Sequence, residues 1–319
     1  MIALASVSGF VQYVIDGLIN GSGYGLIGLS FGLIVAVTGR FHFAWATSYA
    51  LAGFFSAYIA DTTGIPIVPS IIIGLIFGAV FNILTEVLVY RPVAKKAGSQ
   101  TLLAIFVASF GLTIAVPNLI TWIVGSGPAG GENLNWISTA PHSIGGVTFT
   151  TLDVAYVVVT WACGVATWAL LKYSSLGRRI RAVQVNPGMS EAVGINSGNI
   201  FIAVFVLSAL LGGVAAIFTT MRYTGTADMG ETPVFYAFVV AFAAGLGRSP
   251  IRIMVVGTAI GIVEGASAQV LNVQWQQVVV FAILLIYLIF KAARVWRPSL
   301  FQFTVPGRSG VATTTTKPG

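Results

Sequence analysis

The chain has 319 residues, a mean hydropathy of +0.92, 56% hydrophobic residues and only 8% charged residues. This charge content is about a third of that expected of a soluble domain, so we expect an integral membrane protein. Because the chain is so apolar, we interpret its net charge of +7 as a signal of membrane topology and not of nucleic-acid binding. A single cysteine, Cys163, excludes a disulfide framework and a thiolate metal cluster.

Apolar runs near or beyond about 20 residues recur along most of the chain, which favours membrane-spanning helices over the short alternating strands of an outer-membrane barrel. The predicted segments cover residues 10–38, 43–60, 66–90, 101–124, 150–172, 199–221, 233–247, 251–271 and 275–291. Those at 43–60 and 233–247 are short for a full crossing, so broken or re-entrant helices are expected there. The predicted fold is an all-α, polytopic bundle of eight or nine transmembrane segments.

The first predicted segment contains Gly23-Tyr24-Gly25-Leu26-Ile27-Gly28, which matches the GxGxxG dinucleotide pattern. That pattern indicates nucleotide binding only between the strand and helix of a βαβ unit, whereas this one lies in an apolar span. We therefore expect it to form a smooth surface for close helix packing. The same small-residue spacing occurs at Gly21, Gly25, Gly28 and Gly32, at Gly74 and Gly78, and at Gly257, Gly261 and Gly265.

Catalytic and metal-binding chemistry is not indicated. The sequence contains no GxxxxGK[ST] motif, so any ATP that drives this protein is bound by another subunit. His42 has no further ligand nearby that would suggest a metal site. Within the spans, Asp16 and Glu86 lie near helix ends and only Glu264 lies deep, where a structural hydrogen-bonded role is favoured. We expect a non-enzymatic membrane subunit without a cofactor of its own.

A basic segment, Lys172–Asn196, interrupts the apolar pattern in the second half of the chain. Placing it in the cytoplasm puts most basic residues on one side, as the positive-inside rule requires, with the N-terminus outside and the C-terminus inside. The acidic residues Asp61, Glu132, Asp153, Asp228 and Glu231 then fall outside, with Arg222 the only basic residue among them. A long loop, 125–149, is external, and the tail at 304–319 is predicted to be disordered in the cytoplasm.

Three landmarks carry a resemblance to a known family. Asn20–Leu29 is similar to the family's glycine-rich opening, and Leu176–Ala182 followed by Glu191–Asn196 is similar to its Gly-Arg and Glu-Ala elements. Ala244–Gly247, followed by Ser249-Pro250, is similar to a turn between its late spans. The chain resembles the branched-chain amino acid ABC transporter permeases, specifically the LivH-like member of the LivH/LivM pair. Trp45 stands where that family usually has His.

The resemblance implies a permease domain at 1–303 whose cytoplasmic coupling segment, 173–198, docks on an ATPase. It implies a homologous LivM-like permease, two cytoplasmic ABC ATPases that hold ATP and Mg, an extracytoplasmic solute-binding protein, and the bacterial cytoplasmic membrane as location. The residues expected to carry coupling are Arg178, Arg179, Arg181, Glu191 and Gly194, and those expected to line the path are Asn20, Tyr24, Phe43 and Trp45.

The solute stays open between branched-chain amino acids, amides, urea and small carboxylates. An alternative function is an ion-coupled secondary transporter, and a passive channel is less favoured still. A secondary transporter usually has ionisable or oxygen-rich groups near the midplane, and this chain offers mainly Glu264. The basic segment and the scarcity of such groups favour the ABC importer.

Overall fold

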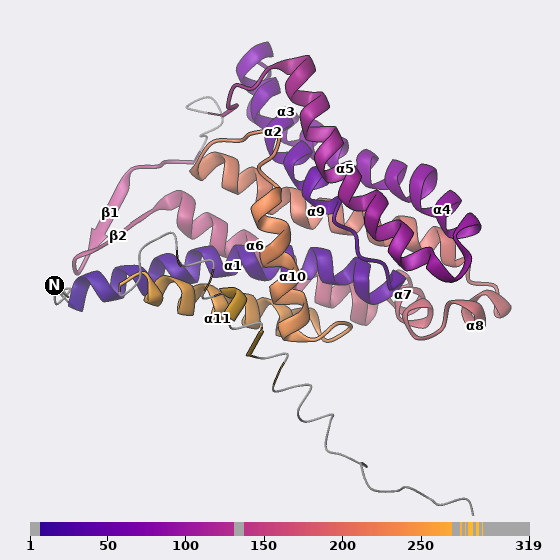
Figure 1. Ribbon diagram of the computed structural model, residues 1–319. Coiled ribbons are helices and arrows are strands. Elements are labelled where there is room, and N and C mark those ends of the chain that lie inside the picture. The colour runs from indigo at the N-terminus through magenta and orange to yellow at the C-terminus, as the bar shows by residue number, and fades with distance from the viewer. Residues whose placement is uncertain are drawn as a thin grey trace, which may run out of the picture.

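The computed structural model describes residues 7–130 and 137–269 together with isolated positions between 275 and 289. The described chain is almost wholly helical (Figure 1). The predicted segment 275–291 is described only at those isolated positions. The expected tail at 304–319 and Glu132 lie outside the described residues.

Six helical stretches of the described chain are long and apolar enough to cross a membrane. They contain α1 (Val7–Thr38), α3 (Ile67–Leu84), α5 (Thr101–Val124), α6 (Thr151–Tyr173), α9 (Ser197–Arg222) and α11 (Pro250–Ser267). Two further helices, α2 (Trp45–Thr63) and α10 (Glu231–Ala244), occupy the two segments predicted to be short. The prediction of an all-α, polytopic membrane bundle is confirmed.

Helix α1 is the centre of the bundle, and α6 and α11 run beside it in Figure 1. The glycines of α1 determine this packing. A Cβ on Gly25 would lie 2.9 Å from Met254 Cα of α11, and one on Gly261 would overlap Gly21 Cα. Further along α1, Gly32 faces Ala241 of α10. The glycine pattern of the first span therefore serves helix packing, as predicted.

A second packed layer joins α2, α3 and α9. Gly78 of α3 lies against the Ser48 carbonyl of α2, where a Cβ would approach to 2.8 Å, and Ser48 Oγ donates to the Gly78 carbonyl at 3.0 Å. Most side chains of α2 are buried, which places this short helix inside protein. Backbone groups of such a helix are shielded from lipid by the helices around it.

The third helix continues past its predicted end at residue 90. A π-helical stretch, Thr85–Tyr90, leads into α4 (Arg91–Lys96), and η2 (Gly98–Gln100) then precedes α5. The Arg91 amide donates to the Glu86 carbonyl five residues earlier, so the wider turn lets the chain remain helical through Pro92, which has no N–H to donate. The arginine-proline pair therefore does not end the helix.

The predicted outer loop contains a β-hairpin that the sequence did not suggest. Strands β1 (Pro141–Ile144) and β2 (Val147–Thr150) pair antiparallel, with Ile144 opposite Val147. Gly145 and Gly146 connect them with positive φ angles of 61° and 83°. A two-residue turn of this kind needs positive φ at both positions, which glycine adopts readily. Gln12 of α1 anchors the hairpin, because its side chain pairs with both backbone groups of Thr148.

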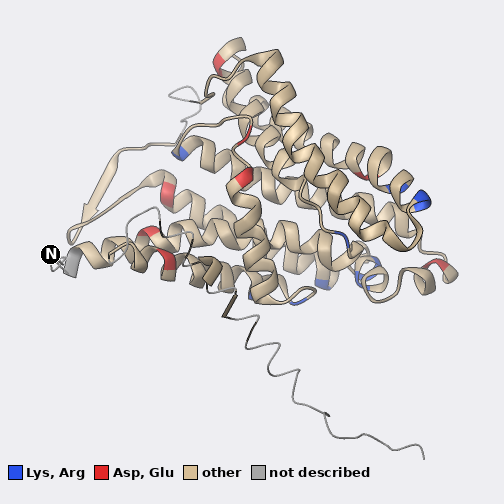
Figure 2. Cartoon of the chain, viewed as in Figure 1, with Lys and Arg blue, Asp and Glu red and all other residues tan. Residues whose placement is uncertain are grey.

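Charge divides the bundle into two ends (Figure 2). Most of the blue residues in Figure 2 lie at one end, beside α4 and the short helices α7 (Ser175–Val185) and α8 (Pro187–Ala192), which we call the basic end. Most of the red residues lie toward the opposite end, where β1, β2 and the start of α6 are found, which we call the acidic end. This separation is the one that the charge pattern of the sequence predicts.

Candidate functional site

A cavity of about 310 Å³ opens near the acidic end of the bundle. Five helices contribute to its wall: α1, α2, α6, α9 and α10. The polar part of its lining consists of Asn20, Tyr24, Tyr49, Tyr156, Thr219, Arg222, Tyr223, Thr232 and Tyr236. Aromatic rings with hydroxyl groups give this cavity apolar faces and polar edges, a combination that suits a small amphipathic solute.

Arg222, the last residue of α9, brings a fixed positive charge to this cavity. Its Nε lies 2.9 Å from Asp153 Oδ1, and its Nη1 donates to Asn20 Oδ1 at 2.8 Å. Asp153 is itself held in place, because its Oδ2 accepts hydrogen bonds from the backbone and side chain of Thr150 in a capping box. The guanidinium keeps further N–H donors beyond these two contacts, and such a group pairs well with carboxylate.

Tyrosines organise the rest of the cavity wall. Tyr24 stacks on Tyr236 with ring centroids 4.4 Å apart, and Tyr236 Oη donates to Glu264 Oε1 at 2.6 Å. Tyr49 Oη lies 2.8 Å from Thr219 Oγ1. Glu264 is 7% exposed and accepts this hydrogen bond.

The four predicted path residues separate into two pairs. Asn20 and Tyr24 line the cavity, whereas Phe43 and Trp45 pack deeper in the protein. Trp45 has no exposed surface, and its Nε1 donates to Ser30 Oγ at 2.7 Å. Phe43 sits among other rings, including Phe106 with centroids 5.4 Å apart. The structure therefore brings Asn20 and Tyr24 together with Arg222 and places the other two outside this cavity.

The predicted coupling segment forms α7 and α8 at the basic end. Gly177 and Ile180 face the bundle, and Gly177 lies so close to the carbonyls of α6 that a side chain has no room there. Arg178, Arg179 and Arg181 are exposed. Arg178 Nη1 donates to the Tyr173 carbonyl at 3.4 Å, and Arg181 Nη1 donates to the Leu171 carbonyl.

Gly194 ends α8 with a positive φ of 85°. Its amide donates to the Glu191 carbonyl at 3.0 Å, and the Ile195 amide donates to the Ser190 carbonyl at 2.9 Å. A glycine in this conformation is the usual way to close a helix C-terminus. Glu191 and Gly194, with Ile195 and Asn196, line an open hollow of about 440 Å³ on the surface.

Apolar side chains are exposed along the same segment. Val185 is 87% exposed, Met189 68% and Val193 72%, and they recur every four residues. This exposed apolar row lies among polar and charged residues at the basic end of the bundle. Val185 ends α7, Met189 lies in α8 and Val193 follows α8 directly, so the row extends over both short helices.

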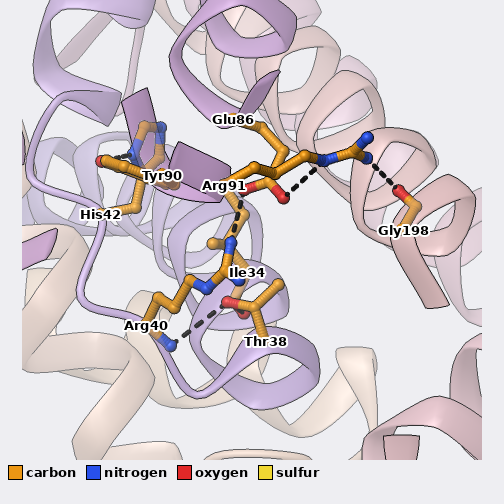
Figure 3. Close-up of polar contacts among 8 residues, drawn as sticks. All are labelled: Ile34, Thr38, Arg40, His42, Glu86, Tyr90, Arg91 and Gly198. Carbon is orange, nitrogen blue, oxygen red and sulfur yellow. Dashed lines mark hydrogen bonds and ion pairs between the residues drawn. The ribbon is translucent and has the colours of Figure 1, made fainter. Parts of the chain in front are cut away.

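A buried ionic cluster connects this segment to the centre of the bundle (Figure 3). Glu86 has no exposed surface; its Oε2 lies 2.6 Å from Arg40 Nη1, and its Oε1 lies 3.4 Å from Arg91 Nε. Arg91 Nη2 in turn donates to the Gly198 carbonyl at 2.6 Å, in the first turn of α9. We call Arg40, Glu86 and Arg91 the Glu86 cluster. It joins the α1–α2 connection, the π-helical stretch and the start of α9.

His42 lies next to this cluster and is fully buried. Its Nδ1 is 2.6 Å from Tyr90 Oη, and its Nε2 is 3.1 Å from Asn82 Oδ1. Both ring nitrogens are thus engaged by side chains of the third helix (Figure 3 shows the Tyr90 contact). These contacts fix the connection between α1 and α2.

A family model described as branched-chain amino acid transport system / permease component matches residues 13–288. The chain belongs to this family. It is therefore a transport permease and not an enzyme, and its apolar helices make it a multi-pass protein of the inner membrane.

Known relatives of this permease match it over most of its length. The high-affinity branched-chain amino acid transport system permease protein BraD of Pseudomonas aeruginosa is 28% identical over 295 residues, covering 88% of this chain and 94% of BraD. The corresponding LivH protein of Salmonella typhimurium is 26% identical over 293 residues, covering 88% and 93%. PsaBC from Streptococcus pneumoniae, solved in complex with Fab, is similar with a TM-score of 0.49 and 12% identity, covering 88% of this chain and 95% of that chain.

Two features of the permease are not visible in its sequence. The sequence shows Arg222 only as a basic residue among acidic ones, and the structure pairs it with Asp153. The sequence places Glu86 near a helix end, and its pairing with Arg40 depends on how the first and third helices pack. A single sequence does not encode that contact in any local pattern.

Proposed function

We propose that this permease is a transmembrane subunit of an ABC importer for a small solute. It works with a homologous permease, with two cytoplasmic ATPases that bind ATP and Mg, and with an extracytoplasmic solute-binding protein. ATP-driven movement of the ATPases would be transmitted through α7 and α8 to the spans. The observation that carries this proposal is the exposed surface of α7 and α8, where arginines and an apolar row occur together.

The chemistry of this surface supports an ATPase as its partner. Arg178, Arg179 and Arg181 would orient the docking by charge, whereas the apolar row at Val185, Met189 and Val193 would supply buried contact area. The hollow at Glu191 and Gly194 would receive part of the partner surface. Docking by both charge and apolar contact fits a subunit that must stay attached while it moves.

The Glu86 cluster supports a physical route from this surface to the spans. Asn196 caps α9 by accepting from the Asn199 amide at 3.0 Å, so α8 leads directly into α9. Two residues after this cap, the Gly198 carbonyl accepts from Arg91, and Glu86 extends the connection to Arg40. We infer that a shift of α8 moves the start of α9 and, through the cluster, the α1–α2 connection. Discrete rearrangements of this kind underlie alternating access.

The cavity at the acidic end supports a carboxylate-bearing amphipathic solute. Arg222 would pair with the carboxylate, and Asn20 and the stacked Tyr24 and Tyr236 would contact the remainder. Branched-chain amino acids and small carboxylates fit this chemistry best among the solutes left open by the sequence, which also include amides and urea. Phe43 and Trp45 would meet the solute only after the helices separate toward the basic end.

The distribution of charge supports the orientation. The basic end would face the cytoplasm and the acidic end would face outward, which puts the N-terminus outside and the C-terminus inside. In this orientation the cavity receives solute from the binding protein, and α7 and α8 reach the ATPases.

A transport experiment separates this proposal from an ion-coupled secondary transporter. The complete complex is reconstituted in proteoliposomes, and solute uptake is measured with internal ATP, with and without ionophores that collapse proton and sodium gradients. We expect uptake to require ATP and to survive the loss of the gradients. Uptake against a gradient by the purified chain alone, or uptake abolished by the ionophores in the presence of ATP, would refute the proposal.

A further inference from the structure

A second cavity, of about 270 Å³, lies at the basic end between α1, α6, α7 and the turn before α11. Its floor is apolar, because Leu29 and Leu33 of α1 and Ile253 of α11 line it together with the Trp168 ring of α6. This cavity is separate from the one that contains Arg222, and of its lining the transport mechanism proposed above uses only Arg181, as one of three docking charges.

Three cations from three different elements surround this floor: Lys172 at the end of α6, Arg181 on α7 and Arg248 in the turn before α11. All three side chains are exposed, and none takes part in an ion pair with the carboxylates of the described chain. The lining contains no aspartate or glutamate. The cavity therefore combines an apolar floor with a positive rim that lacks a counterion among the described residues.

Aromatic residues place the rim at the depth of a membrane surface. Lys172 Nζ lies 4.8 Å from the centroid of the Trp168 ring and 5.2 Å from that of Tyr173, which is 65% exposed. Tryptophan and tyrosine concentrate where lipid headgroups meet hydrocarbon. Helices α6 and α11 also expose apolar side chains, Val165 and Val255 among them. The cavity itself combines the cationic rim with an apolar floor, as a phospholipid combines a charged headgroup with an acyl chain.

We propose that this cavity binds an anionic phospholipid. The phosphate of the headgroup would lie among Lys172, Arg181 and Arg248, and the first part of an acyl chain would cover the apolar floor. Basic pockets between spans on the cytoplasmic side recognise anionic headgroups in this way. An acidic surface of an ATPase would match the charges but not the apolar floor, so lipid is the occupant that the two features together favour.

The bound lipid would link the coupling segment to the bundle. Arg181 belongs to α7, whereas Lys172 and Arg248 belong to the elements that flank it. A shared phosphate would neutralise the mutual repulsion of the three cations and hold α7 against α6 and α11. This proposal does not depend on which solute is transported.

Photolabelling of the assembled transporter tests the proposal. The complex is reconstituted in nanodiscs that contain a trace of phosphatidylglycerol with a diazirine on its acyl chain, or the matching phosphatidylcholine, and labelled peptides are identified by mass spectrometry. We expect the phosphatidylglycerol to label the peptides around Trp168 and Ile253 at least about tenfold more than phosphatidylcholine. The double variant Lys172→Gln with Arg248→Gln should lose this excess.

Two control variants make the result decisive. Lys95→Gln with Lys96→Gln removes the same charge at the same end but outside the cavity, and it should leave the labelling unchanged. Lys172→Arg with Arg248→Lys keeps both charges and should retain the excess. Equal labelling by the two lipids would overturn the proposal. Labelling seen with the chain alone but absent in the complete complex would also overturn it, because the ATPase would then be the occupant.

Discussion

The Glu86 cluster gives the sharpest quantitative prediction. Glu86 is fully buried, and its two partners Arg40 and Arg91 have side chains that are 13% and 34% exposed. Glu86→Gln preserves the shape of the side chain and removes its charge, so two poorly hydrated guanidinium groups lose their counterion. Removing one partner of a buried ion pair costs about 3 to 5 kcal/mol. Because both arginines retain some contact with solvent, we expect a cost near the lower value, about 3 kcal/mol.

This cost corresponds to a change of about 100-fold in the folding equilibrium, because each 1.4 kcal/mol is tenfold. At about 2 °C per kcal/mol, the expected decrease in the apparent Tm is about 6 °C. The assay is a thermal scan of tryptophan fluorescence for the purified complex in detergent, at one fixed scan rate. Glu231→Gln is the matched control, because Glu231 is exposed, lies away from α7 and α8 and forms none of the ion pairs described above. A Tm for Glu86→Gln within about 1 °C of the control would show that Glu86 is not the counterion that stabilises Arg40 and Arg91.

Three further predictions follow from individual contacts. Gly261→Ala should destabilise the bundle by about 1 to 3 kcal/mol through overlap with α1, measured by thermal scan, whereas Gly111→Ala, with open space around its Cβ position, should not. Arg222→Lys should reduce ATP-driven solute uptake about tenfold, because lysine keeps the positive charge but lacks the planar set of N–H donors of the guanidinium. Unchanged uptake would contradict a carboxylate-binding site at Arg222. Trp45→Phe should lower stability by about 1 to 3 kcal/mol by removing a buried hydrogen bond, and Trp122→Phe, at a ring that is 83% exposed, should have no measurable effect.

Much of the fold was predictable because the membrane imposes simple requirements on sequence. The lengths of the apolar runs located the helices, and the glycines of the first span predicted close packing before its partner was known. That the partner is α11, about 240 residues away, depends on the tertiary arrangement, as the contact between Gly21 and Gly261 illustrates. The spacing of small residues marks a packing surface but does not say which surface it meets.

Other features depended on local geometry that the sequence pattern obscured. The third segment is predicted to end at residue 90, but the π-helical turn there lets the helix continue through Pro92, which has no N–H to donate. The hairpin around Gly145-Gly146 lay in a stretch with too few alternating residues to stand out as two strands.

The functional regions also differ in how far the sequence predicts them. The coupling segment was recognised by its charge and by motifs that are continuous in sequence. Residues from five helices line the cavity around Arg222. Of these, the sequence predicted only Asn20 and Tyr24 as residues of the path. The lipid site likewise joins Lys172 and Arg248 from distant parts of the chain. Sites built by packing are visible only once the packing is known.

We propose that α7 and α8 transmit ATPase movement to the spans. The most direct measurement is solute uptake and ATP hydrolysis by the reconstituted complex carrying Arg178→Glu with Arg179→Glu, two exposed positions outside both cavities. Lys95→Glu with Lys96→Glu is the control for an equal change of charge at the same end. We predict that uptake per ATP hydrolysed falls at least about tenfold in the first variant, by loss of about 1.4 kcal/mol or more of coupling, at an unchanged amount of permease in the membrane. Wild-type uptake per ATP hydrolysed in that variant would contradict the account.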